Sequence, residues 1–299
     1  MVLSKTIAKI RKEKNLTVND LIRDNMSKSS YNRFAAGKAD IHSHYFIELL
    51  KRLHVTLTEL EYIDRGYVPK DINIYLSRIK KFFNKRDANA LKGIIKILES
   101  EYSKIHNTEY QHLIGLCEIL IARLNHYKLD MNQNILYRYL INTSSWTRYE
   151  IILFNNSLFY IEPETLSILL SNALKHVHEL DDLNPQVVEG FRLLSNAIIS
   201  LLYQQEPTLA LYYISKLEEF QVKEEHVYER ILLLFFKGIR KKLEGYSEIE
   251  YNKEFNKLYF ILDVLQWRSK KGFLKMHCKI IMLKIKNNHL KQPCRLIFN

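Results

Sequence analysis

Glycine and proline are scarce in this sequence, with eight Gly and five Pro among 299 residues. β-Sandwiches and β-barrels need many turns that these two residue types supply, so their scarcity argues against both classes. No run of eighteen apolar residues occurs either, and we expect no membrane insertion. What the chain does have is a hydrophobic content of 47%, typical of a folded protein. We therefore predict an all-α fold.

Cysteine is also rare, and Cys117, Cys278 and Cys294 have neither a metal-binding spacing nor the even number of a disulfide set. This usage is typical of a reducing compartment, so we expect a cytoplasmic protein. A glycine-rich phosphate loop, a nucleophile elbow and a His-Glu-x-x-His motif are absent. The pair His42 and His44 does not by itself make a metal site. We expect no enzyme, no metal and no cofactor.

Positive charge is concentrated at both ends of the chain, whose net charge is +12. Residues 1–52 hold eleven Lys or Arg against five acids, and the chain after Asp263 holds nine Lys or Arg and no acid. Such a distribution indicates an anionic partner and says nothing about the fold. The basic stretch 268–299 has three interpretations: a helix on a membrane surface, an extra nucleic-acid surface, or the closing helix of a repeat with a solvated lysine face.

The first 66 residues predict five short helices. Thr17 is suited to cap the second helix, with Asp20 as its partner three residues later. Ser27 is suited to cap the third helix, and Gly37 to end it in a left-handed conformation. The remaining two caps are expected at Ser43 and Thr58.

Two short helices joined by a tight turn, within a basic unit, are typical of a helix-turn-helix. The third helix would enter the major groove of double-stranded DNA with its N-terminal end, where backbone amides also attract a phosphate. The predicted DNA-binding residues are Thr17, Ser27, Lys28, Ser29, Ser30, Asn32, Arg33 and Lys38. Tyr31 and Phe34 are interpreted as core residues. Because one helix-turn-helix covers half of a two-fold site, we expect a homodimer.

Gly66 and Pro69 mark the clearest boundary in the chain, which predicts domains at 1–66 and 67–299. Beyond it, Asp87, Asn107 and Ser247 are suitable N-caps. The helical segments are expected at 72–85, 87–101, 107–125, 132–142, 145–157, 162–179, 184–204, 206–219, 225–243, 247–266 and 269–288. About five helix pairs and a closing helix, each pair on the order of 35–40 residues, predict a tetratricopeptide-like α-solenoid. The concave side of such a solenoid is suited to bind a peptide.

Two segments resemble a known family. The stretch from Thr17 to Leu21 and the stretch Met26-Ser-Lys-Ser-Ser-Tyr-Asn-Arg-Phe34 with Gly37 are similar to the Cro/repressor-type helix-turn-helix of the Rgg/MutR regulators of Gram-positive bacteria. The family pattern there is S-x-S-x-x-S-R-F-E-x-G, and the chain matches it at Ser27, Ser29, Arg33, Phe34 and Gly37. A second segment, which runs from Trp146 to Asn156, resembles W-x-x-Y-E-x-x-L-F-x-N in the C-terminal domain of that family.

The resemblance implies a sequence-specific, dimeric transcription regulator whose repeat domain binds a short peptide pheromone, as in quorum sensing. It also implies that Arg11 lies near the DNA phosphates. The implied effector-binding residues are Asn155, Asn156, Phe159 and Tyr160. Phe159 stands where peptide-sensing members have Arg, so a charged clamp is missing. This leaves two alternatives: a more hydrophobic peptide than usual, or an effector of another kind.

The chain departs from the family helix-turn-helix at two positions. Ala35 replaces the family Glu, and Ala36 stands where a basic or polar side chain is common. The change at position 36 predicts the loss of one phosphate contact. These departures keep a second function open, that of a helical-repeat adaptor that sequesters a protein partner without operator-specific DNA binding.

Overall fold

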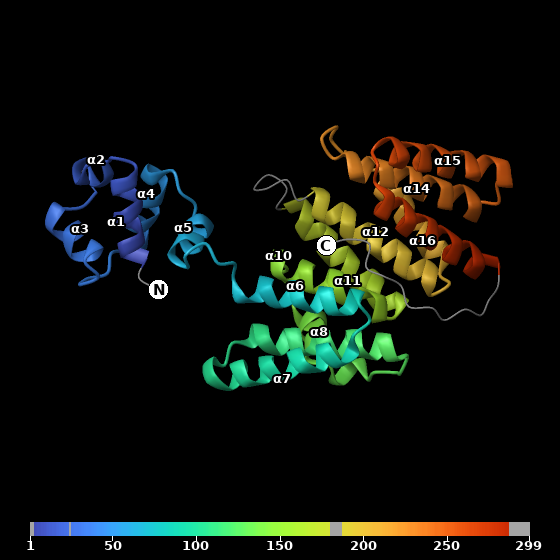
Figure 1. Cartoon of the computed structure of the whole chain (residues 1–299), viewed down its shortest axis with the longest axis horizontal. Helices are drawn as coiled ribbons and strands as arrows, with labels where there is room; N and C mark the ends of the chain where they lie inside the picture. The colour runs from blue at the N-terminus through green and yellow to red at the C-terminus, as the bar shows by residue number, and fades with distance from the viewer. Residues whose placement is uncertain (1–2, 24, 180–186, 287–299) are drawn as a thin grey trace. The chain divides into compact units, whose positions relative to one another are not determined.

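The computed structural model describes residues 3–23, 25–179 and 187–286, and in these ranges it contains α-helices, two short 3₁₀ helices and no strand (Figure 1). The prediction of an all-α protein is confirmed. Contacts divide the chain into two compact units, Met1–Arg78 and Ile79–Asn299. The division falls inside helix α6 (Asp71–Asn84), which follows the Gly66–Pro69 segment directly.

The first unit contains five short helices ahead of α6. They are α1 (Leu3–Glu13), α2 (Val18–Ile22), α3 (Lys28–Ala35), α4 (Ser43–Leu53) and α5 (Leu57–Asp64). Helix α1 contacts α3 and α5, and α2 contacts α3 and α4. One apolar core joins them: Ile7, Ile10, Leu21, Ile22, Tyr31, Phe34, Leu49, Leu50, Leu53 and Leu60. Because α2 and α3 both contribute to this core, the turn between them is held in one geometry.

Three local signals in this unit are confirmed. The Thr17 hydroxyl accepts from the Asp20 amide at 3.1 Å, and the Asp20 carboxylate accepts from the Thr17 amide at 2.8 Å, which forms a capping box. The Ser27 hydroxyl accepts from the amide of Ser30 at 3.1 Å. Gly37 has a φ of +72°, and its amide donates to the carbonyl of Phe34 at 2.8 Å, so α3 ends as a glycine-terminated helix should.

Two predicted caps are wrong. Helix α4 begins at Ser43, and the N-cap residue is His42, whose side chain makes no capping hydrogen bond. Helix α5 is capped by Thr56 and not by Thr58. The reason for the second difference is a capping box: the Thr56 amide donates to the Glu59 carboxylate at 2.7 Å, and the Glu59 amide donates to the Thr56 hydroxyl at 3.2 Å.

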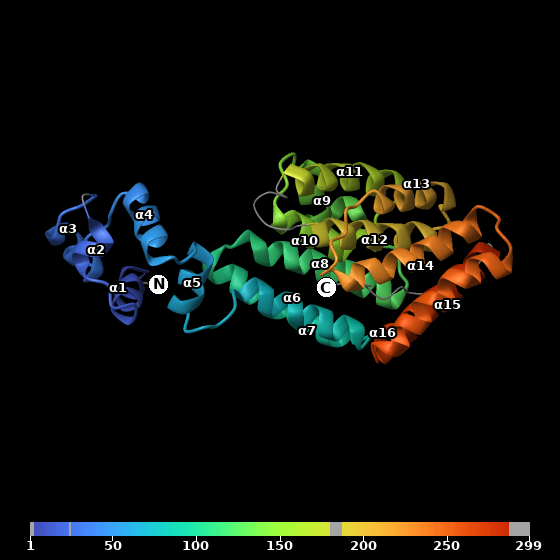
Figure 2. The same ribbon diagram turned by 90° about the horizontal axis from the view of Figure 1, so that it is seen from above.

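The second unit continues as helix pairs. Its helices after α6 are α7 (Ala88–Ile105), α8 (Thr108–Asn125), α9 (Ile135–Asn142), α10 (Arg148–Ser157), α11 (Pro163–Glu179), α12 (Val187–Tyr203), α13 (Pro207–Glu218), α14 (Val227–Leu243), α15 (Glu248–Val264) and α16 (Arg268–Lys286). The 3₁₀ helices are η1 (Met131–Gln133) and η2 (Leu158–Tyr160). Helices adjacent in sequence pack side by side, α14 on α15 for example (Figures 1 and 2). The eleven predicted segments correspond to α6–α16, so the predicted solenoid is confirmed.

Helix starts in this unit also follow the sequence signals. Asp87, Asn107 and Ser247 are the N-caps of α7, α8 and α15. Pro163 and Pro207 are the first residues of α11 and α13, where proline costs no intrahelical hydrogen bond. A third proline expected in a first turn, at position 185, lies outside the described residues.

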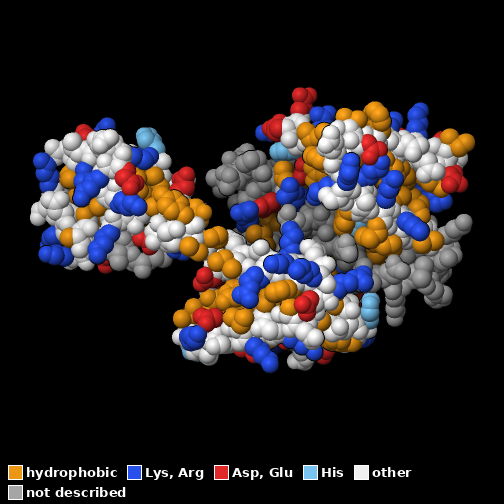
Figure 3. Space-filling model, viewed as in Figure 1, with side chains coloured by type: hydrophobic (Ala, Val, Ile, Leu, Met, Phe, Trp, Pro, Cys, Tyr) orange, Lys and Arg blue, Asp and Glu red, His pale blue; other side chains and the backbone are white. Residues whose placement is uncertain are grey.

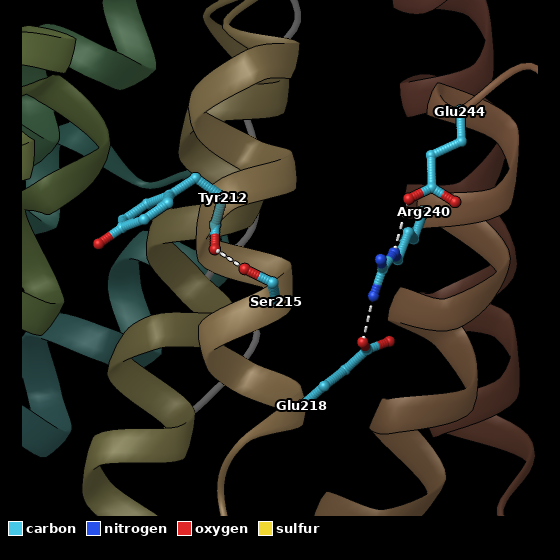
Figure 4. A network of polar contacts seen from close by, with 5 residues as sticks. All are labelled: Tyr212, Ser215, Glu218, Arg240 and Glu244. Atoms are coloured by element: carbon cyan, nitrogen blue, oxygen red, sulfur yellow. Dashed lines mark hydrogen bonds and ion pairs between the residues drawn. The ribbon is translucent and has the colours of Figure 1, made fainter.

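Ion pairs join helices at the surface of the unit. Between α13 and α14, the Arg240 guanidinium binds Glu218 at 2.5 Å and Glu244, on its own helix, at 2.7 Å (Figure 4). On α13 the hydroxyl of Ser215 donates to the carbonyl of Tyr212 at 2.6 Å. Exposed pairs of this kind contribute about 0–1 kcal/mol each, so the apolar contacts between the helices dominate the stability.

Helix α16 closes the repeat. It packs against α12 and α15 and buries Leu274, His277 and Ile281, while Lys275 and Lys279 are exposed. Residues 287–299 of the basic tail lie outside the described residues. In the ranges that the structure describes, no helix combines the length and the apolar character needed to cross a membrane. The described part of the tail is thus a packed helix with a lysine-bearing outer face.

Candidate functional sites

The first candidate site is the surface around the N-termini of α2 and α3. The exposed side chains there include those of Thr17, Ser27, Lys28, Ser29, Ser30, Asn32, Arg33 and Lys38. Asn19, Asp20 and Arg23 of the α2 region are exposed as well. Tyr31 and Phe34 of the same helix are buried in the core of the unit. Helix α3 therefore has one apolar face toward the core and one polar, basic face toward solvent. The first eight of these exposed residues are the ones that sequence analysis predicts to contact DNA.

The N-terminus of α3 is suited to receive an anion. The Ser27 hydroxyl engages the Ser30 amide, and the two hydroxyls lie 2.9 Å apart. The amides of the first helical turn, which include those of Lys28 and Ser29, have no partner within the helix. A phosphate placed there would meet these amides and the ammonium group of Lys28.

Arg11 differs from the other predicted residues because it is half-buried. Its guanidinium donates to the carbonyl of Leu16 and so ties α1 to the turn before α2. It also lies near Tyr31, whose pKa is raised by burial and lowered in part by the Arg11 charge. Position 35 carries Ala, so no carboxylate is available there for Arg11. The structure gives Arg11 a part in holding the turn, and its role toward phosphate stays a prediction.

Three lysines that sequence analysis did not single out lie beside α3. Lys5, Lys9 and Lys12 of α1 line a shallow surface depression together with Ala35. Lys9 forms an ion pair with Glu13 at 3.8 Å, with both side chains largely exposed. These three positive charges therefore lie next to Ala35, which replaces the Glu of the family pattern.

The second candidate site surrounds the end of α10. The amide group of Asn156 donates to the carbonyl of Ile152 in its own helix at 2.7 Å. The Asn155 oxygen accepts from the amide group of Asn196 on α12 at 2.8 Å. The Tyr160 hydroxyl donates to a backbone carbonyl at 2.5 Å and accepts from a backbone amide at 2.8 Å, both in the loop after α8. The four predicted residues are half-buried, and Asn155 is the one that contacts another helix by a side-chain hydrogen bond.

Another residue, Arg123, places a guanidinium group against Phe159, the position at which the family Arg is missing. Arg123 of α8 stacks over the Phe159 ring, 4.4 Å from its centroid, and lies 5.3 Å from the ring centroid of Phe83 on α6. Such a contact with two rings is a cation–π interaction. The sequence analysis missed Arg123 because it lies among apolar residues of α8, where a charged side chain has no periodic signal.

The aromatic residues of the segment 146–156 have structural roles. The Trp146 side chain is 1% exposed, its indole nitrogen donates to the carbonyl of Thr143 at 2.9 Å, and its ring packs edge-on against Phe154. The Tyr149 hydroxyl lies 2.7 Å from Nδ1 of His112. Burial lowers the pKa of His112, and the charge of Glu150 opposes this effect. The interpretation of these aromatics as core agrees with the burial of Trp146 and Phe154.

A line of polar side chains extends from Asn155 across alternate helices. Asn196 lies one helical turn from Arg192 on α12, and the Arg192 guanidinium binds Glu229 of α14 at 3.1 Å. We call Asn155, Asn196, Arg192 and Glu229 the polar row. In a solenoid of helix pairs, alternate helices line the same face, so α10, α12 and α14 present the polar row on one side. Sequence spacing within one helix cannot reveal such a row.

Comparisons with known proteins identify the fold and the family. A protein from Listeria monocytogenes EGD-e described as a transcriptional regulator superposes with a TM-score of 0.79 at 20% identity, over 96% of this chain and 99% of that one. The SHP pheromone receptor Rgg2 of Streptococcus dysgalactiae gives 0.72 at 21% identity, over 92% and 98%. PrgX in its complex with cCF10 gives 0.67 at 18% identity, over 95% and 93%. At these identities the structures establish the shared fold.

The family model described as "HTH-type transcriptional regulator Rgg, C-terminal domain" matches residues 96–271, more than half of the chain. The chain belongs to the Rgg family. The family resemblance stated from the two sequence segments is thereby confirmed, as is the interpretation of the protein as a transcription regulator. The match begins within α7 and ends within the first turn of α16. It therefore includes the Trp146–Asn156 segment, Arg123 and the polar row.

Proposed function

We propose that this Rgg-family protein is a homodimeric, cytoplasmic regulator that binds operator DNA through α2 and α3 and responds to a short peptide bound by the repeat unit. The observation that carries the DNA-binding part is the composition of the solvent face of α3. The eight predicted polar or basic side chains are exposed around α2 and α3 while Tyr31 and Phe34 anchor the helix from behind. A rigid helix with a basic, hydroxyl-rich face is what major-groove recognition requires.

Arg33 is the residue we assign to base recognition. It is exposed on α3, and among the described residues its side chain forms no hydrogen bond or ion pair, while its backbone carbonyl accepts from the Lys38 amide at 2.9 Å. Its removal therefore leaves the fold intact. We expect Arg33→Ala to weaken binding to the chain's own promoter DNA by roughly 1–3 kcal/mol, or about 5- to 160-fold. The exposed Arg230 of α14 supplies the matched control, and Arg230→Ala should bind as the wild type does.

Phosphate contacts should be visible in the salt dependence. Lys28→Ala is expected to weaken binding to promoter and random duplex equally and to lower the salt slope by about one unit. Ala36→Lys tests the family departure in the opposite direction, because position 36 is exposed and the new ammonium group should raise the slope by about one unit. Both slopes are measured by fluorescence anisotropy with labelled duplexes.

The same assay decides between the proposal and the adaptor alternative. Salt-sensitive binding with a preference for the promoter is expected. A wild-type protein that binds neither duplex at ~50 mM salt, where phosphate contacts are strongest, would refute DNA binding and leave the adaptor.

Peptide control is supported by the amide side chains and the aromatic surface at the end of α10. Asn155 is half-buried and carries an amide group of the kind that holds an extended peptide backbone, and the buried Asn196 donates to its oxygen at 2.8 Å. Phe159 with Arg123 provides a ring and a cation. Solved structures described as the SHP pheromone receptor Rgg2 and as a bacterial peptide pheromone/receptor complex have this fold. Asn156→Ala is expected to weaken the response of a promoter reporter in the native host to a culture-derived peptide fraction, with operator affinity unchanged. An unaltered response would place the ligand elsewhere.

A further inference from the structure

An apolar patch lies on the first unit, around α5 and the segment that follows it. Leu57 and Tyr62 of α5, and Tyr67 and Val68 after the helix, are between 41% and 60% exposed. We call these four residues the α5 patch. Figure 3 shows hydrophobic side chains gathered on the side of the first unit where α5 lies. Large apolar side chains that are concentrated in this way on a folded unit mark a surface for a partner.

Local contacts hold the α5 patch in one shape. The amide of Tyr67 donates to the carbonyl of Tyr62 at 2.8 Å, and the two rings meet edge to face with centroids 5.6 Å apart. The Nε of Arg65 donates to the carbonyl of Val68 at 3.2 Å. The segment after α5 is therefore fixed against the helix, and the patch is formed before a partner binds.

The charge around the α5 patch differs from that of the rest of the unit. Residues 1–52 hold eleven Lys or Arg against five acids, whereas residues 53–71 hold two Lys or Arg against four acids. Within the latter stretch, Glu61 binds Lys70 at 2.7 Å and Arg65 at 3.8 Å. Two copies of a basic unit repel each other across their basic surfaces. The side at α5, where charges are balanced within the unit, is therefore the side on which two copies can approach.

The size of the unit brings two DNA-bound copies into contact. A compact unit that spans Met1–Arg78 has a radius of gyration of about 12 Å and hence a diameter of about 30 Å. Adjacent half-sites on one face of DNA lie about 34 Å apart, so two copies on such sites meet at their edges. None of the α5 patch residues belongs to α2 or α3, and contact through the patch leaves the DNA-facing side chains of α3 free.

The area of the α5 patch limits the strength of the contact. Aromatic side chains bury about 150–250 Å² each and aliphatic ones somewhat less, and about half of each is exposed, so the patch presents roughly 350 Å². A symmetric pair of patches would bury about 700 Å², less than the roughly 1,200 Å² of a specific interface that is stable on its own. The contact is therefore weak between free copies and forms when DNA places two copies side by side.

We propose that the α5 patch of one protomer binds the same patch of a second copy of the chain when both occupy adjacent half-sites, and that this contact fixes the half-site spacing of the operator. The inference rests on the proposed DNA binding as a homodimer and specifies how the two first units are held. A two-fold contact of this kind needs one self-complementary surface, because each copy presents the same patch to the other.

The test uses the full-length protein and duplexes from the chain's own promoter. DNase I footprinting defines the two half-sites. Fluorescence anisotropy then measures binding to the whole site, to a single half-site, and to a lengthened site with five more base pairs between the half-sites. This insertion is about half a helical turn and places the half-sites on opposite faces of the duplex. We expect the wild type to bind the whole site about tenfold more tightly than the lengthened site.

Variants connect this preference to the α5 patch. Tyr67→Lys and Val68→Lys each place like charges across the two-fold contact, and each should weaken whole-site binding about tenfold, leave half-site binding unchanged and abolish the preference over the lengthened site. Because lysine adds positive charge, weaker binding does not come from electrostatic repulsion by DNA. Tyr67→Phe keeps the ring and should behave as the wild type. Tyr212→Lys, at an exposed tyrosine of α13, is the matched control and should also behave as the wild type.

The results that overturn the inference differ from the result that overturns DNA binding. Equal binding of the whole and lengthened sites by the wild type, or an unchanged preference in both Lys variants, refutes contact through the α5 patch and leaves DNA binding intact. Equal weakening on the whole site and the half-site also refutes it, because the residues then act within one unit. A wild type that binds none of the duplexes at ~50 mM salt refutes the proposed DNA binding itself.

Discussion

Helices α8 and α9 approach each other closely at Gly115, and replacement of this glycine tests the packing of the repeat unit quantitatively. A Cβ atom on Gly115 would lie 2.9 Å from both the Cβ and the backbone nitrogen of Leu136, and 3.1 Å from the side-chain oxygen of Asn134. Asn134 caps α9 and donates to the Gly115 carbonyl at 3.0 Å. Since a backbone atom is among the neighbours, rotation of one side chain cannot relieve the overlap.

The expected magnitude follows from three contributions. Replacing glycine by alanine inside a helix favours the folded state by about 1 kcal/mol. Overpacking costs about 2 kcal/mol, and displacement of the Asn134 cap costs about 1 kcal/mol more. We therefore expect Gly115→Ala to lower the free energy of unfolding by about 2 kcal/mol.

Urea unfolding followed by tryptophan fluorescence is the appropriate assay, because the two Trp residues of the chain, Trp146 and Trp267, both lie in the repeat unit. With a urea dependence of about 3 kcal/mol per molar, the midpoint should fall by roughly 0.7 M. Gly93→Ala on α7 is the matched control, since a Cβ there meets nothing within 4 Å, and it should raise stability by up to about 1 kcal/mol. If Gly115→Ala were as stable as Gly93→Ala, the close approach of α8 and α9 would be refuted.

Two further predictions concern a helix cap and a buried histidine. Thr56→Ala removes the capping box of α5, and a loss of about 1 kcal/mol should speed hydrogen exchange of the α5 amides about fivefold, measured by mass spectrometry; unchanged exchange would contradict the box. Burial lowers the pKa of His112 in the folded protein, so the unfolded chain takes up a proton first as the pH falls. The stability that neutral His112 contributes is therefore complete above about pH 6.5 and decreases as the pH falls from there toward the lowered pKa. In urea unfolding between about pH 7.5 and pH 5.5, His112→Gln should show a smaller loss of stability than the wild type, and equal losses would exclude His112 as the cause.

Much of the fold could be predicted from local sequence, because helix starts and stops are short-range events. Thr17 with Asp20, Ser27 and Gly37 identify the ends of α2 and α3 by hydrogen bonds within three or four residues. The same holds for the caps of the repeat helices. Where two signals competed within a few residues, as at Thr56 and Thr58, the sequence alone did not decide which would form the cap.

In the candidate sites, too, some residues could be predicted from local sequence and others required the tertiary structure. The exposed face of α3 follows from helical periodicity, since Tyr31 and Phe34 direct the opposite face outward. Arg11 required the structure, because its half-buried contact with the carbonyl of Leu16 depends on the turn after α1. Arg123 required it as well: its partner Phe159 is remote in sequence.

The sequence by itself determined the all-α class, the order of the helices, the helix-turn-helix surface and, through two short motifs, the family. These properties depend on the periodicity and capping of single helices and on residue identities. Only the tertiary structure decided that Asn155 of α10 contacts Asn196 of α12 and that Arg192 of α12 binds Glu229 of α14. The physical reason is that a solenoid places alternate helices on one face, so residues far apart in the chain become electrostatic neighbours without any periodic signal in the sequence.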